Sequence, residues 1–194
     1  SPAADRGAGA GCADAGSAAS AAPRPILLLQ SPGANHPFDA YLEEVLLTEG
    51  YNGYEKRSPA EAGDLTRFAL VLVARGAAAQ MNAETVLNCV RQGGRAVVFQ
   101  PPRDWAARFG LQPAARMYSV ARDAYLHVNL QHAWMKGFPA ADLQVPGEAH
   151  VYGAGTAEPL AFVAGQRAQP SLFPAVAWQQ QGSGAAVIFT YDLA

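Results

Sequence analysis

The sequence predicts an α/β fold: a mainly parallel sheet flanked by helices, with an antiparallel hairpin at the C-terminal end. Three short, continuous apolar runs at residues 25–30, 68–74 and 96–99 are typical of strands that are buried on both faces. Helical patterns lie between these runs, as expected for right-handed β-α-β units. Later segments alternate apolar and polar residues, which is typical of strands with one buried face.

The first helix is predicted to begin at Pro37, because the missing N–H of proline costs nothing in a first turn. Gly50 is expected to end this helix. Residues 51–56 form a weaker strand candidate, and residues 58–66 a polar connection. The helix has one apolar stripe with i, i+3, i+4 and i+7 spacing. This stripe comprises Phe38, Tyr41, Leu42, Val45 and Leu46.

Asn82 is predicted to cap a further helix that ends at Gly93-Gly94. Cys89 lies on the inward face of this helix, so we expect a small buried residue and no disulfide. A short helix carrying Trp105 and Phe109 should follow the strand at residues 96–99.

The second half of the chain is predicted to be mostly strands. Residues 125–130 alternate, with Leu126, Val128 and Leu130 on one face. Residues 181–184 (Gln-Gly-Ser-Gly) join the last two strands as a hairpin. The other strand candidates are residues 148–152, 160–164, 175–178 and 185–191.

Composition divides the chain into two parts. Residues 1–24 are nearly all Ala, Gly, Ser, Pro and Asp, so this segment is expected to be a disordered leader or linker, while residues 25–194 form one domain. Such a leader favours an exported protein, extracytoplasmic or secreted. The net charge of −2 gives no electrostatic basis for binding nucleic acid, and no apolar run is long enough to span a membrane.

Three stretches carry a family resemblance. Residues 88–98 place Gly93-Gly94 between helix and strand, residues 134–139 read Trp-Met-Lys-Gly-Phe-Pro, and residues 174–193 contain a Gly-Ser-Gly turn and a closing Tyr-Asp-Leu. In this order they resemble the class I glutamine amidotransferase-like superfamily, especially ThuA-like proteins and the amidotransferase-like middle domain of some β-galactosidases. The resemblance covers residues 25–194. It implies a flavodoxin-like fold and a module of a long extracellular bacterial protein.

The chain departs from the superfamily at the positions that carry chemistry. Active amidotransferases have a Cys at the elbow after the strand that residues 96–99 resemble, and a His-x-Glu pair near the end of the domain. This chain has Gln100-Pro101 and Tyr191-Asp192 there. A glutaminase needs a thiolate beside a base, and Cys89 precedes the strand. The resemblance therefore implies a scaffold without catalytic residues, and we expect neither a cofactor nor a metal.

The residues that follow the strands are candidates for a ligand site or an interface, because ligands of open α/β sheets bind at the carboxyl ends of the strands. A working ligand cleft and a vestigial site of ordinary loop residues are both open. In the interface hypothesis, another segment docks near Tyr191, Asp192 and the Gln100–Arg103 turn. The candidates are Asn35, His36, Arg75, Gln100, Arg103, Asp104, Tyr191 and Asp192.

Other chemistry-bearing residues show no decisive pattern. No spacing among the four histidines forces a metal site, even with Glu148 close to His150. Spacing pairs none of the acid/base candidates Asp123, Asp142 and Asp192 into a glycosidase site. Aromatic residues could form a sugar-stacking surface or lie in the core. These are Trp134, Tyr152 and Trp178.

We therefore expect a non-catalytic module that binds or assembles within a larger extracellular protein. One alternative is a hydrolase or carbohydrate-active enzyme that uses His36, Arg103 and Asp104. Another is a sugar-binding module that uses Trp134 or Trp178. The expected partners are the polypeptide that continues after the closing strand, another subunit of the same protein, or carbohydrate.

Overall fold

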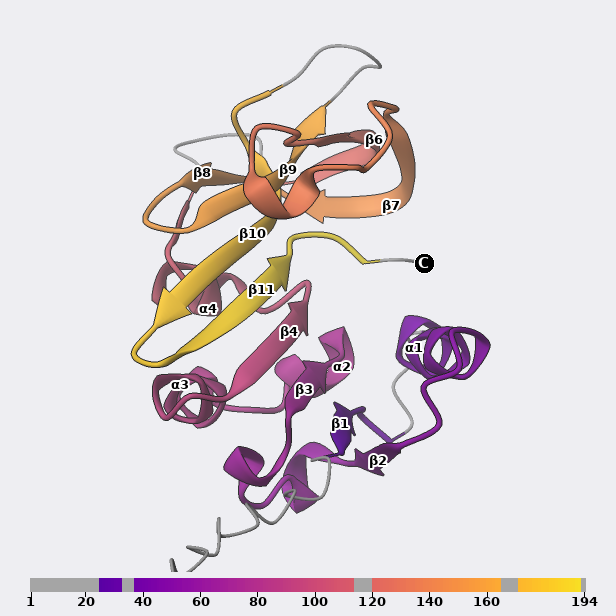
Figure 1. Cartoon of the computed structure of the whole chain (residues 1–194), viewed down its shortest axis with the longest axis vertical. Coiled ribbons are helices and arrows are strands. Elements are labelled where there is room, and N and C mark those ends of the chain that lie inside the picture. The colour runs from indigo at the N-terminus through magenta and orange to yellow at the C-terminus, as the bar shows by residue number, and fades with distance from the viewer. Residues whose placement is uncertain (1–24, 33–36, 114–119, 165–170, 193–194) are drawn as a thin grey trace, which may run out of the picture.

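The computed structural model describes residues 25–32, 37–113, 120–164 and 171–192. They form an α/β fold around one nine-stranded sheet with the order β2-β1-β3-β4-β11-β10-β9-β6-β7 (Figure 1). Neighbours from β2 to β11 pair in parallel, and neighbours from β11 to β7 pair antiparallel. The predicted parallel sheet thus holds for one half only, because the later strands join through hairpins instead of helical crossovers.

Two further strands, β5 and β8, form a small antiparallel sheet. The strands are β1 (Ile26–Leu29), β2 (Tyr54–Arg57), β3 (Leu70–Val73), β4 (Arg95–Phe99), β5 (Leu111–Pro113), β6 (Val120–Val128), β7 (Leu143–His150), β8 (Tyr152–Ala154), β9 (Glu158–Ala164), β10 (Pro174–Gln181) and β11 (Gly184–Phe189). The helices are α1 (Pro37–Thr48), α2 (Arg75–Ala78), α3 (Ala83–Arg91) and α4 (Arg103–Arg108), with 3-10 turns η1 (Pro59–Glu61), η2 (Leu65–Arg67) and η3 (Ala133–Met135).

The parallel strands are covered on both faces, as their continuous apolar sequences predict. On one face, Leu27 and Leu29 of β1 share a buried cluster with α3 and α4. On the other face, Leu28 packs with Leu42 and Leu46 of α1. Figure 1 shows α3 and α4 on one side of the sheet and α1 on the other. Within the described residues, no helix is long and apolar enough to cross a membrane.

The predicted turn from α3 into β4 is confirmed, and its glycines are required by close packing. Asn82 caps α3 by accepting a hydrogen bond from Glu84 N at 3.0 Å. Gly93 has a φ of 97°, a conformation that L side chains rarely adopt. A Cβ on Gly184 would overlap the carbonyl oxygens of Val90 and Gly94. The end of α3 therefore rests directly on the backbone of the closing hairpin.

The closing hairpin is confirmed, and one predicted strand is divided. β10 and β11 pair antiparallel from Val176 to Gln181, as expected for the turn at residues 181–184. Residues 148–152 were expected to form one strand, but β7 ends at His150 and β8 begins at Tyr152. The chain changes sheet at Val151, because β7 pairs with β6 while β8 pairs with β5.

Candidate functional site: the carboxyl edge of the sheet

The carboxyl ends of β3, β4 and β11 come together at one edge of the sheet. Gln100, which follows β4, donates its backbone N–H to Phe189 O at 2.8 Å. Arg75, which follows β3, pairs with Asp192 after β11, with Nη1 to Oδ2 at 3.2 Å. Four of the candidate residues are thus collected at this edge: Arg75, Gln100, Tyr191 and Asp192.

Gln100 occupies the elbow position with a left-handed backbone, at a φ of 34°. Such strained strand-to-helix turns present nucleophiles in other α/β proteins. Here the side chain is only 2% exposed, and its Nε2 donates to Glu148 O at 2.8 Å. Its Oε1 is buried and has no hydrogen-bond partner among the described residues. The elbow is therefore filled by an amide that binds the chain's own backbone.

Residues 148–152 cover this elbow. His150 N donates to Thr190 O at 2.7 Å, and Ala149 forms an isolated bridge with Tyr191. Tyr191 is consequently buried. The surface on which we expected another segment to dock near Tyr191 and Gln100 is thus occupied by residues 148–152 of the same chain.

His150 and Tyr152 bring two further titratable groups to the edge. His150 Nδ1 lies 3.3 Å from the Tyr152 hydroxyl. Burial, together with the nearby charges of Arg103 and Arg75, lowers the pKa of His150 to about 4. Burial also raises the pKa of Tyr152 to about 12 and the pKa of Tyr191 above its ordinary value. At neutral pH the edge therefore holds a neutral imidazole and two protonated phenols. None of these three groups is an activated nucleophile.

Asp39 was not among the candidate residues, yet it links the segments that follow β1 and β3. Its carboxylate is buried and accepts hydrogen bonds from Ser31 N at 3.2 Å and Gly76 N at 3.3 Å. The Gln80 side-chain amide donates to Ser31 Oγ beside it. The only sequence signal for this role was an acidic residue in the first turn of a helix. Such a residue usually indicates only a favourable interaction with the helix dipole.

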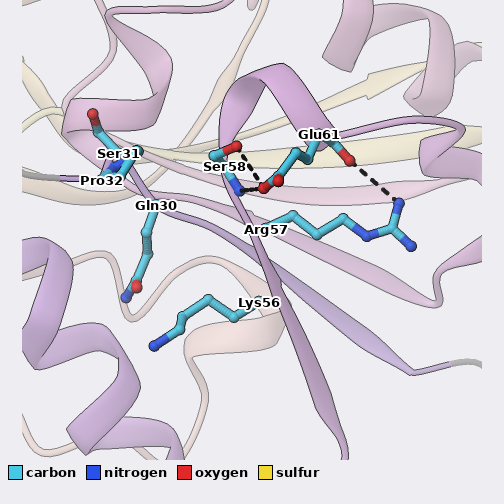
Figure 2. Close-up of a pocket in the computed structure, with 7 residues that line it drawn as sticks. All are labelled: Gln30, Ser31, Pro32, Lys56, Arg57, Ser58 and Glu61. Carbon is cyan, nitrogen blue, oxygen red and sulfur yellow. Dashed lines mark hydrogen bonds between the residues drawn. The ribbon is translucent and has the colours of Figure 1, made fainter.

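A polar groove of about 470 Å³ lies next to Ser31, over the ends of β1 and β2. Figure 2 shows Glu61 turned back onto Ser58, whose N and Oγ donate to Glu61 Oε2 at 3.3 and 2.7 Å. Lys56 pairs with Glu43 at 2.8 Å and Arg57 with Glu55 at 2.6 Å, so both cations are compensated. The groove is lined by Gln30, Ser31, Pro32, Lys56, Arg57, Ser58 and Glu61.

The remaining candidate residues join this edge only in part: the charge of Arg103 acts on His150, but no side-chain contact among the described residues brings the whole set together. Arg103 and Asp104 are exposed in the first turn of α4, while Gln100 points away under residues 148–152. Asn35 and His36 lie outside the described residues. The hydrolase hypothesis needs His36, Arg103 and Asp104 to lie together. Because His36 lies outside the described residues, the structure does not show this grouping.

The aromatic candidates are separated by burial. Trp134 is 55% exposed and meets Trp178 edge to face, with ring centroids 5.1 Å apart. Tyr152 is buried in the core that α3 and α4 share. His132 also contacts the Trp134 ring, with ring centroids 5.7 Å apart. Trp134 thus remains partly accessible to a ligand, whereas Tyr152 does not.

The described histidines have local partners. His127 Nδ1 lies 3.0 Å from Asp142 Oδ1, and His132 Nε2 lies 3.2 Å from Glu158 Oε2. Across the described ranges, no three His, Cys, Asp or Glu side chains gather closely enough to hold a metal ion. Cys89 is buried in α3, as predicted.

No protein-family model matches the sequence, and no curated protein is significantly similar to it. The fold does match solved structures. A β-galactosidase from Bacillus circulans sp. alkalophilus is 15% identical with a TM-score of 0.62, over 88% of this chain and 29% of that one. The α-L-fucosidase isoenzyme 2 from Paenibacillus thiaminolyticus is 11% identical with a TM-score of 0.61, over 87% and 29%.

A cytoplasmic protein from Salmonella typhimurium matches over 87% of both chains, at 11% identity and a TM-score of 0.58. The chain therefore spans less than a third of the two glycosidases but nearly all of the Salmonella protein. These likenesses establish the α/β fold.

Proposed function

We propose that the chain is a non-catalytic amidotransferase-like module that serves binding or assembly within a larger extracellular, carbohydrate-active protein. The observation that carries the proposal is the elbow after β4. A glutamine stands there, with its amide on Glu148 O at 2.8 Å and its side chain sealed under residues 148–152. The strand order β2-β1-β3-β4 in the parallel half supports a flavodoxin-like scaffold.

The solved structures support the carbohydrate part of the proposal. The matching β-galactosidase and fucosidase carry this fold in 29% of their length, which is consistent with a module beside a separate catalytic domain. The polar groove over β1 and β2 and the exposed ring of Trp134 are surfaces that a sugar could use.

Turnover assays test the proposal. The chain is incubated with glutamine, simple amides, and aryl β-galactosides, α-fucosides and β-mannosides, while ammonia and phenol release are followed. We expect no turnover above buffer. Turnover that disappears in a Cys89→Ala, His150→Gln or Asp192→Asn variant would contradict the proposal, because it would place chemistry in this chain.

Sugar binding through Trp134 is the second candidate, favoured by the exposed ring packed against Trp178. Exposed aromatic faces bind the apolar faces of sugar rings. On a glycan array, Trp134→Ala should abolish any binding that the wild-type chain shows. Tyr51→Ala is the matched control, because Tyr51 is an exposed aromatic residue outside the site. Binding that survives Trp134→Ala would exclude this residue.

A further inference from the structure

Among the described residues, the sheet face that carries α1 is covered at its two ends and open between them. At one end Leu42 and Leu46 of α1 pack on β1 and β3. At the other end Met135 of η3 packs on the cluster formed by β6, β7, β9 and β10. A groove of about 520 Å³ separates them, lined by apolar residues. Its floor includes Val97, Phe99, Val176, Val187 and Phe189.

The groove has the properties expected of a surface that an apolar helix covers. Its floor contains β4 and β11, which pair in parallel, and parallel strands are normally covered by helices on both faces. Here α3 and α4 cover only the opposite face. The described lining residues include no polar side chain that could orient a small ligand, unlike ordinary ligand pockets.

Helix α1, which forms one wall of the groove, has more large apolar side chains than it buries against the sheet. Only Asp39, Glu43, Glu44 and Thr48 are polar in this 12-residue helix. Beyond the buried Leu42 and Leu46, α1 leaves large apolar side chains about half exposed, and helices that are apolar on several sides are normally buried. The exposed residues are Tyr41, Val45 and Leu47.

We propose that α1 of a second copy of this chain occupies the groove, in a two-fold symmetric dimer. The two α1 helices would lie side by side between the two sheets, each filling the partner's groove, so one contact covers both apolar surfaces. Charge agrees with this arrangement: Glu44, the exposed acidic residue of α1, precedes Val45, and the exposed Lys136 follows Met135 on the opposite rim. The inference rests on the assembly part of the proposed function. The dimer is tested by molar mass and the proposed function by turnover, so each can fail without the other.

Light scattering after size exclusion and sedimentation velocity test this dimer at micromolar concentrations. We expect twice the chain mass of 20.3 kDa for the wild type. Val45→Glu on α1 and Phe138→Glu on the opposite rim should each weaken the dimer at least about tenfold, because each buries a charge in an apolar contact. Leu172→Glu is the matched control, since Leu172 is 83% exposed and does not line the groove.

Three results would overturn the inference: a monomeric wild type, a dimer that neither groove variant weakens, or an equal loss caused by Leu172→Glu. Circular dichroism shows whether each variant is folded. Val45 and Phe138 are both substantially exposed, so we expect folded chains. The two substitutions lie on opposite walls, and therefore either folded variant decides the question.

Discussion

At the elbow after β4, Gln100 combines a φ of 34° with a buried side chain held by Glu148 O. The left-handed conformation costs an L residue about 1 kcal/mol. The hydrogen bond to Glu148 and the covering segment hold the turn in place. The Gln100 side chain thus explains why the left-handed turn is kept although it carries no nucleophile.

Substitution of Gln100 separates these two effects. Gln100→Ala loses the bond to Glu148 O and should lower the free energy of unfolding by about 1–2 kcal/mol. Gln100→Gly loses the same bond but relieves the backbone, so it should be about 1 kcal/mol more stable than the alanine variant. Urea unfolding of the pair measures this. A glycine variant no more stable than the alanine variant would contradict the strained-elbow interpretation.

His150 should make stability depend on pH in mild acid. Its pKa falls from about 6.5 to about 4 on folding, so the unfolded chain binds more protons between these values. The free energy of unfolding should therefore decrease as the pH falls from 6.5 towards 4. His150→Gln should flatten this part of the profile, measured by urea unfolding at several pH values. An unchanged slope would show that His150 is not the group responsible.

The sequence could not predict these residue-level features. No residue next to Gln100 in the sequence indicates a positive φ, because the backbone conformation of Gln100 is held by the segment that begins at Glu148. Asp39 was likewise missed, since its partners Ser31 N and Gly76 N are contributed by the ends of two different strands. Both features depend on long-range contacts.

At the scale of elements, strands with continuous apolar sequences were predictable. β1, β3 and β4 follow the apolar runs closely, because burial on both faces leaves a strong signal. β7 begins earlier than expected and ends at His150. Pro146 and Gly147 interrupt its alternation in the sequence, and the change of sheet at Val151 is decided by the partners β6 and β5.

Truncation of the central strands should be costly. Leu28 of β1 and Val98 of β4 are fully buried, and each lies in a packed cluster. Leu28→Ala and Val98→Ala should each lower the free energy of unfolding by about 2–5 kcal/mol, through lost burial and a residual cavity. Leu172→Ala, at an exposed position, should cost almost nothing. Equal losses in all three variants would contradict the assigned core.

At the scale of the whole molecule, composition and strand order gave the α/β class but not the mixed sheet. The parallel half follows from helical crossovers, which the sequence displays. The antiparallel half depends on how β6, β9 and β10 pair across long sequence separations. The open groove beside α1 was also unpredicted, because Val45 belongs to the same periodic stripe as the buried Leu42 and Leu46.

The central claim is that the chain's own residues seal the elbow, so that no nucleophile could work there. Thiol accessibility tests this directly. Gln100→Cys and Arg103→Cys are made in a Cys12→Ser background, and the rate of modification by a thiol reagent is measured in native buffer and in urea. Arg103 is exposed, whereas Gln100 is 2% exposed. We predict that the Gln100→Cys thiol reacts as slowly as buried Cys89 until the chain unfolds, while the Arg103→Cys thiol reacts at once. Rapid native modification of Gln100→Cys, matching that of Arg103→Cys, would contradict the account.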